Sequence, residues 1–131
     1  MLKYLIILRR ELESRNIKID QQNYSYLTIE NIRKSFEDLL EVWGLDFNLS
    51  GKLWDLYLEF ENSNQEYFQR IKDDASSAVT TNIIRSIYRR RLSFAHIELD
   101  IVWSEYKNWE KNESELQKVQ NKYREVKYHK F

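Results

Sequence analysis

The chain has 131 residues, a length typical of one domain that buries a hydrophobic core. Its 21 lysines and arginines are balanced by 21 acidic residues, so no net charge draws the protein toward the phosphates of nucleic acid. The absence of cysteine excludes disulfides and thiolate metal sites and is typical of a reducing compartment. The two histidines, His96 and His129, are isolated in the sequence, and we expect neither a metal site nor a cofactor.

The composition favours helices along the whole chain. Proline is absent and there are only two glycines, while charged residues, at 32%, supply the solvated faces that many helices need. Aromatic residues reach 15%, so we expect large rings to pack between helices. The apolar run from Tyr4 to Leu8 is much shorter than the roughly 20 residues of a membrane span, and we expect no secretory signal and no membrane contact.

The first two predicted helices differ in how clearly the sequence marks them. The first, at about 2–13, contains an apolar run without helical periodicity. The second is predicted from Thr28, its expected N-cap, to Trp43, with Gly44 as the expected left-handed residue after its end. Ser50 is the expected N-cap of the next helix. The apolar stripe of the second helix consists of Ile29, Ile32, Phe36, Leu39, Leu40 and Trp43.

The remaining helices follow from periodic apolar segments separated by polar ones. The third helix is apolar on most of its circumference, which indicates packing on two sides, and it is expected to run on to about Ile71. Polar residues then predict an exposed loop at 72–80. A fourth helix is expected from near Thr80 to near Leu92, and a fifth around Leu99–Trp109. A thin apolar stripe predicts a last helix at 114–128.

Two sequence motifs each occur twice. The first, W-x-x-Y-x-x-(F/W)-E, spans Trp54–Glu61 and Trp103–Glu110. The second, I-R-x-x-(F/Y)-x-x-x-L, spans Ile32–Leu40 and Ile84–Leu92 and precedes each copy of the first. The repeated unit is therefore a pair of helices. The motif residues that we expect to carry the structure are Ile32, Arg33, Phe36, Trp54, Tyr57, Phe60, Glu61, Arg85, Tyr88, Leu92, Trp103, Tyr106, Trp109 and Glu110.

The repeat predicts an all-α fold, namely an α-solenoid of antiparallel helix pairs with about six helices. We expect a single domain over residues 1–131. Its repeat pieces lie at about 28–61 and 80–110, with partial terminal repeats at 1–20 and 114–128.

Charged residues of the two motifs lie beside apolar positions, where an unpaired charge is costly. We expect Glu61 to pair with Arg85, with two separately solvated side chains as the alternative. Arg89 follows Arg85 by one helical turn and extends a basic strip, which is a candidate contact for a partner or for RNA. A solvated basic face is the alternative. The strip consists of Arg85, Arg89, Arg90 and Arg91.

Both motifs together resemble the HAT (half-a-TPR) repeat of proteins that act in pre-mRNA splicing, mRNA 3′-end cleavage and ribosomal RNA processing. The likeness covers about Ile29 to Val126. The segments Leu53–Glu61, Ile84–Leu92 and Trp103–Trp109 look most like the N-terminal HAT region of the U4/U6 snRNP recycling-factor subfamily.

This resemblance implies a non-catalytic protein-interaction scaffold in a nuclear RNA-processing complex, with pre-mRNA splicing as the expected process. Proteins of a spliceosomal or other RNA-processing particle are the expected partners. One alternative is a helical module that binds RNA directly through the arginine strip, and another is a helical assembly protein unrelated to RNA. An enzyme is not expected, because the sequence shows no Gly-rich phosphate loop, no nucleophile elbow and no cluster of metal ligands.

Overall fold

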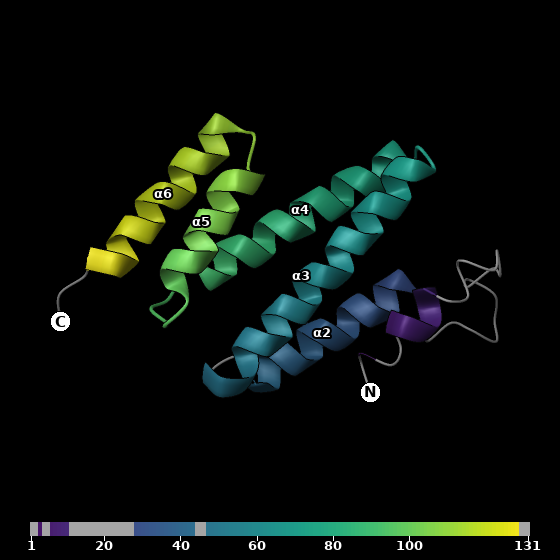
Figure 1. Ribbon diagram of the computed structural model, residues 1–131, viewed down its shortest axis with the longest axis horizontal. Coiled ribbons are helices and arrows are strands. Elements are labelled where there is room, and N and C mark those ends of the chain that lie inside the picture. Colours follow the sequence, from purple (N-terminus) through teal and green to yellow (C-terminus); the bar gives the residue numbers. More distant parts are fainter. Residues whose placement is uncertain (1–2, 4–5, 11–27, 44–46, 129–131) are drawn as a thin grey trace. The chain divides into compact units, whose positions relative to one another are not determined.

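The computed structural model describes residues 3, 6–10, 28–43 and 47–128 (Figure 1). This part of the chain is helical with short connections and contains no strand, and residues 6–10 form a short helical stretch. The predicted fold class, an all-α helical-repeat solenoid of about six helices, is confirmed. The helices with full bounds in this part of the chain are α2 (Ile29–Trp43), α3 (Phe47–Arg70), α4 (Asp74–Arg91), α5 (Leu99–Trp109) and α6 (Glu113–Tyr128).

The chain divides into two compact units, residues 1–60 and 61–131, and the division lies within α3. The single domain predicted over residues 1–131 stays a prediction. Most of the helix predicted at 2–13, and with it the partial repeat 1–20, lies outside the described residues, as does Gly44. Among the described residues, no helix combines the length and the apolar character needed to cross a membrane.

In the first unit, α2 packs on the first half of α3 through aromatic rings. The predicted N-cap of α2 is confirmed, because the Asn31 backbone N–H donates to Thr28 Oγ1 at 3.2 Å. Further along α2, the ring of Phe36 stacks on Tyr57 with centroids 4.5 Å apart and an angle of 4° between the rings. Phe36 also contacts Phe60 at 5.7 Å. Since Phe36 is 0% exposed, this stack forms part of the core of the unit.

The N-cap predicted at Ser50 is wrong. Helix α3 already begins at Phe47, so Ser50 lies inside its first turns and is buried. Serine costs only a few tenths of a kcal/mol inside a helix relative to better helix formers, and tertiary packing readily outweighs a preference of that size.

The second unit corrects the predicted loop at 72–80, which is wrong. The connection between α3 and α4 covers only 71–73, and α4 begins at Asp74 rather than near Thr80. Lys72 adopts the left-handed conformation (φ 58°), and the Asp73 N–H donates to the Phe68 carbonyl at 2.9 Å, which closes the end of α3. Asp73 then caps α4, because its Oδ1 accepts from the Ser76 N–H at 3.1 Å. The polar residues thus start a helix instead of forming a loop.

Helices α4, α5 and α6 follow one another as antiparallel neighbours in the second unit (Figure 1). The connection 92–98 joins α4 to α5, and 110–112 joins α5 to α6. Tyr88 of α4 contacts Tyr106 of α5 with ring centroids 5.4 Å apart. Trp103 of α5 stacks on Tyr123 of α6 at 4.7 Å and 11°. Aromatic rings therefore join α4 to α5 and α5 to α6.

Candidate functional site

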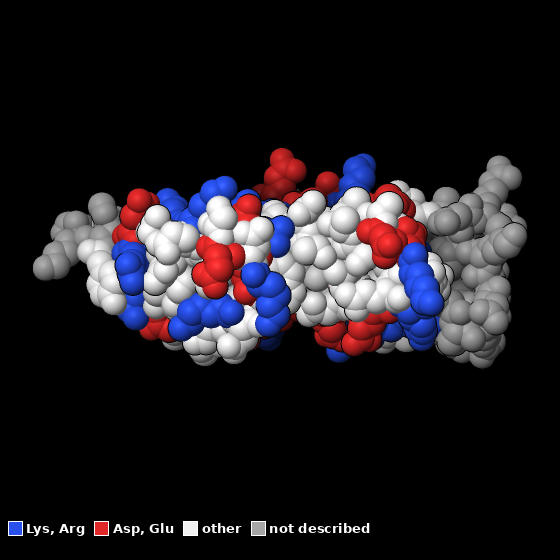
Figure 2. All heavy atoms as spheres, turned by 90° about the horizontal axis from the view of Figure 1, so that it is seen from above, with Lys and Arg blue, Asp and Glu red and all other residues white. Residues whose placement is uncertain are grey.

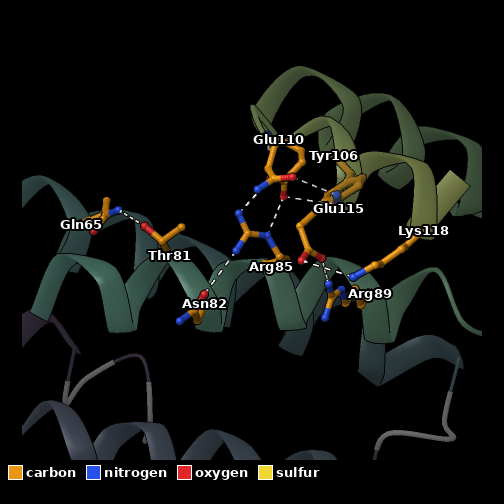
Figure 3. A network of polar contacts seen from close by, with 10 residues as sticks. Gln65, Thr81, Asn82, Arg85, Arg89, Tyr106, Glu110, Glu115 and Lys118 are labelled. Carbon is orange, nitrogen blue, oxygen red and sulfur yellow. Dashed lines mark hydrogen bonds and ion pairs between the residues drawn. The ribbon is translucent and has the colours of Figure 1, made fainter. Parts of the chain in front are cut away.

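Arg85 and Glu110 join α4 to the end of α5 through a bidentate ion pair (Figure 3). Arg85 Nε donates to Glu110 Oε2 at 2.8 Å, and Nη2 donates to Oε1 at 2.8 Å. The remaining guanidinium nitrogen, Nη1, donates to Asn82 Oδ1 at 3.2 Å. The side chain of Glu110 is 0% exposed and that of Arg85 is 19% exposed. Two parallel bonds in a largely buried place make this a strong and geometrically specific contact.

The carboxylate of Glu110 receives two further hydrogen bonds. The Tyr106 hydroxyl donates to Oε2 at 3.2 Å, and the Asn112 backbone N–H donates to Oε1 at 3.2 Å. The hydrogen bonds from Arg85 are the largest cause that lowers the pKa of Glu110 below its ordinary value. The same bonds raise the pKa of Arg85. We call Arg85, Tyr106 and Glu110 the α4–α5 clamp.

The clamp corrects the predicted pair of Glu61 with Arg85, which is wrong. Arg85 lies on the side of α4 that faces α5, with its guanidinium 5.6 Å from the ring centroid of Trp109. Glu61 is 0% exposed and accepts a hydrogen bond from Asn64 Nδ2 at 3.0 Å. Arg85 therefore binds Glu110, the acid of the first-motif copy that follows it in the chain. It does not bind Glu61, the acid of the first-motif copy that precedes it.

The predicted motif residues lie almost entirely in the interior. Tyr88 packs against Tyr106 and also against Trp109, whose ring centroid is 5.7 Å away. Burial raises the pKa of Tyr88 to about 12. Arg33, Arg85 and Trp109 are half-buried. The buried motif residues are Ile32, Phe36, Trp54, Tyr57, Phe60, Glu61, Tyr88, Leu92, Trp103, Tyr106 and Glu110.

The four arginines of the predicted basic strip do not lie on one surface. Successive helix residues point about 100° apart, so neighbouring side chains face different neighbours. Arg89 pairs with Glu115 of α6, whereas Arg91 is 2% exposed and donates to Glu98 Oε2 at 3.1 Å. Arg90 is half-buried. Arg91 is thus buried and Arg85 belongs to the clamp, while the predicted partner or RNA contact stays a prediction.

The charges on the surface are mixed in sign. On the face drawn in Figure 2, basic and acidic side chains alternate and leave no broad area of one sign. This pattern agrees with the balance of 21 basic and 21 acidic residues in the chain. Among the described residues, the face drawn in Figure 2 therefore lacks the continuous positive path that follows a nucleic-acid backbone.

A second polar contact, between α5 and α6, was not predicted from the sequence. The Tyr123 hydroxyl donates to Asp100, and Lys127 Nζ lies 3.1 Å from Asp100 Oδ1. Hydrogen bonds from Tyr123 and Lys127 lower the pKa of Asp100, and the hydrogen bonds of Lys127 with Tyr123 and with Asp100 raise the pKa of Lys127. The spacing of Tyr123 and Lys127 places them on one face of α6. Nothing in the sequence pointed to Asp100 as their partner.

His96 and the acidic residues complete the inventory of reactive groups. His96 Nε2 lies 2.7 Å from the carbonyl oxygen of Arg91, so this histidine caps the end of α4. Within the described part of the chain, no group of three or more His, Cys, Asp or Glu side chains could hold a metal ion.

Comparison with known proteins identifies one family. The model of the family "Suppressor of forked protein (Suf)" matches residues 4–129. No curated protein and no solved structure matches the chain. The matched family is related to HAT repeats, so the predicted membership of the wider HAT family is confirmed, while the specific likeness to the U4/U6 snRNP recycling factor stays a prediction.

Proposed function

Because the chain belongs to the Suppressor of forked (Suf) family, a helical-repeat family of RNA processing, we propose that it is a non-catalytic protein-interaction scaffold of a nuclear RNA-processing complex. Helical repeats stack into long surfaces that bind other proteins without chemistry of their own. The proteins of such a complex are the partners.

One observation supports the proposal that the protein is not catalytic: the ionisable groups with shifted pKa values bind one another and join helices. Catalytic acids and bases combine a shifted pKa with access to a substrate. The pKa of Glu110 is shifted, but its side chain is 0% exposed and binds Arg85 and Tyr106. Asp100 and Lys127 bind each other between α5 and α6. These groups join helices, which supports a structural role.

Direct RNA binding is the less favoured alternative. It depended on the strip of four arginines, of which Arg85 is bound by Glu110 and Arg91 is buried beside Glu98. Arg89, whose side chain is 45% exposed, pairs with Glu115. Phosphate binding by these side chains would have to displace carboxylates that are already in place, which favours protein partners over RNA.

Within RNA processing, we assign the chain to pre-mRNA splicing, with a role like that of the U4/U6 snRNP recycling factor. The support is the resemblance of the repeated segments Leu53–Glu61, Ile84–Leu92 and Trp103–Trp109 to that subfamily. A nuclear location follows from this assignment.

Affinity purification of the tagged full chain from nuclear extract tests the proposal. Recovered proteins are identified by mass spectrometry and recovered RNAs by hybridisation to U4 and U6 probes, with the tag alone as control. We expect splicing proteins together with both RNAs. Recovery of 3′-end cleavage proteins without U4 and U6 would contradict the splicing assignment alone. Recovery of no RNA-processing protein above the tag control would contradict the scaffold role.

A further inference from the structure

Three apolar side chains are exposed together where α4 turns into α5. Ile97 is 99% exposed, Ile101 is 61% exposed and Phe94 is 36% exposed. Ile97 lies in the turn directly before α5, and Ile101 lies in the first turn of that helix. We call Phe94, Ile97 and Ile101 the hairpin-tip patch. Clustered apolar exposure of this kind marks interaction sites more often than isolated apolar residues do.

The connection that carries the patch is anchored at both ends. His96 Nε2 lies 2.7 Å from the Arg91 carbonyl oxygen, and the Ser93 hydroxyl donates to the Arg90 carbonyl at 2.7 Å. Arg91, itself buried, holds Glu98 at 3.1 Å. Ile97 is therefore presented to solvent by a connection with internal hydrogen bonds. A prearranged surface loses little conformational entropy when it binds a partner.

The size of the patch limits what it can bind. The exposed fractions of its three residues amount to about two full side chains, on the order of 300 Å² of apolar surface. A stable dimer needs about 800 Å² on each partner. The patch is therefore too small for a second copy of the chain and matches a single helical segment of another protein.

Charges beside the patch indicate the chemistry of that segment. Glu98 is the N-cap residue of α5, and Glu105, which is exposed, follows Ile101 by one helical turn. Glu98 is offset by Arg91, which leaves the charge of Glu105 beside the apolar surface. Helix α5 also carries Asp100, paired with Lys127, and Lys107, which lies over the Trp103 ring. A cation on the segment, aligned with Glu105, would complement this acidic residue.

We infer that the hairpin-tip patch binds an amphipathic helix of a protein partner, with apolar side chains on Ile97 and Ile101 and a lysine or arginine facing Glu105. This inference rests on the proposed scaffold function and names the partner chemistry of one of its surfaces.

Selection of a displayed library of random peptides, each roughly 15 residues and about four helical turns long, on the full chain tests the inference. We expect the selected peptides to share apolar residues at helical spacing together with lysine or arginine. Their affinity should fall about tenfold on Ile97→Ser and on Glu105→Lys. Val79→Ser, which changes a side chain 51% exposed on α4, is the matched control and should leave the affinity unchanged.

Several outcomes would overturn the inference. One is that the selected peptides bind the Ile97→Ser variant as tightly as they bind the parent, and another is that they share a consensus rich in acidic residues. Two further contradicting results are self-association of the chain and RNA binding by the chain, if Ile97→Ser abolishes either of them.

Nuclear-extract purifications separate this inference from the proposed function. Equal recovery of the RNA-processing particle by the parent and by Ile97→Ser would overturn the inference and leave the function standing. Peptide binding at the patch without recovery of any such particle would contradict the function alone.

Discussion

The Arg85 guanidinium and the Glu110 carboxylate form two parallel hydrogen bonds of 2.8 Å between α4 and the end of α5. Tyr106 and the Asn112 N–H fill further positions on the same carboxylate. Because the Glu110 side chain is 0% exposed, the charge on either partner is compensated only while the other is present. The loss of either partner should therefore be costly.

Removal of one charge from the clamp should destabilise the protein strongly. We expect Glu110→Gln to lower the free energy of unfolding by roughly 2–4 kcal/mol, because it leaves Arg85 partly buried without its carboxylate. Urea unfolding followed by circular dichroism measures the change. Glu105→Gln, an exposed site on the same helix, is the control and should stay within about 0.5 kcal/mol of the parent. Equal losses for the two variants would contradict the role of the clamp.

The clamp should also make the protein sensitive to acid. The pKa of Glu110 lies below its ordinary value of 4.5, so the folded state binds this proton less readily than the unfolded state does. The resulting stability is present above pH 4.5 and is lost as the pH falls through the lower folded-state pKa. Urea unfolding measured at a series of pH values should show a steeper loss below pH 4.5 for the parent than for Glu110→Gln. Parallel curves would count against this linkage.

Lys72 offers a substitution that should stabilise the protein. Its φ of 58° places a side chain in the left-handed region, where a residue with a Cβ atom is disfavoured and glycine is not. Glycine relieves the unfavourable left-handed conformation, but it also gives the unfolded chain more conformational freedom. We expect Lys72→Gly to raise the free energy of unfolding by a net amount of roughly 0.5–1 kcal/mol. Thermal melting measures this. Lys111→Gly, which changes an exposed lysine in the connection 110–112, is the comparison and should give no gain.

The sequence predicted the helices better than it predicted their ends. The fold class, the N-cap at Thr28 and the end of α4 near Leu92 agree with the structure, because periodic apolar spacing and capping residues act locally. The loop at 72–80 was wrong because Asp73 to Ser77 has the polarity of a loop, while Asp73 also acts as an N-cap. An aspartate three residues before a serine in a segment without proline was the signal that could have revealed this start.

The candidate site was harder to predict for a physical reason. The motif spacing placed Arg85 and Glu110 in the correct helices, but which acid faces an arginine depends on the rotation of each helix about its axis. Trp43 shows the same limit, because the apolar stripe of α2 includes it while the structure leaves it 46% exposed. The contact of Asp100 with Tyr123 likewise depends on how α5 and α6 pack against each other.

The stacked tryptophan of the second unit should contribute much of its stability. Trp103 is 8% exposed and stacks on Tyr123, so Trp103→Ala removes a large buried ring and leaves a cavity. We expect a loss of roughly 3–5 kcal/mol in the free energy of unfolding. Trp43→Ala is the matched control, because that ring is half exposed and its loss should cost much less. Similar thermal melts for Trp103→Ala and the parent would contradict the packing role.

Nuclease treatment during affinity purification tests the scaffold function most directly, because it separates contacts with proteins from contacts that pass through RNA. The tagged full chain is purified from nuclear extract with and without ribonuclease, and the recovered RNA-processing proteins are quantified by mass spectrometry. We predict that these proteins remain bound after the RNA has been digested. Their complete loss on digestion, with the chain still folded, would show that RNA carries the association and would contradict a scaffold that binds proteins.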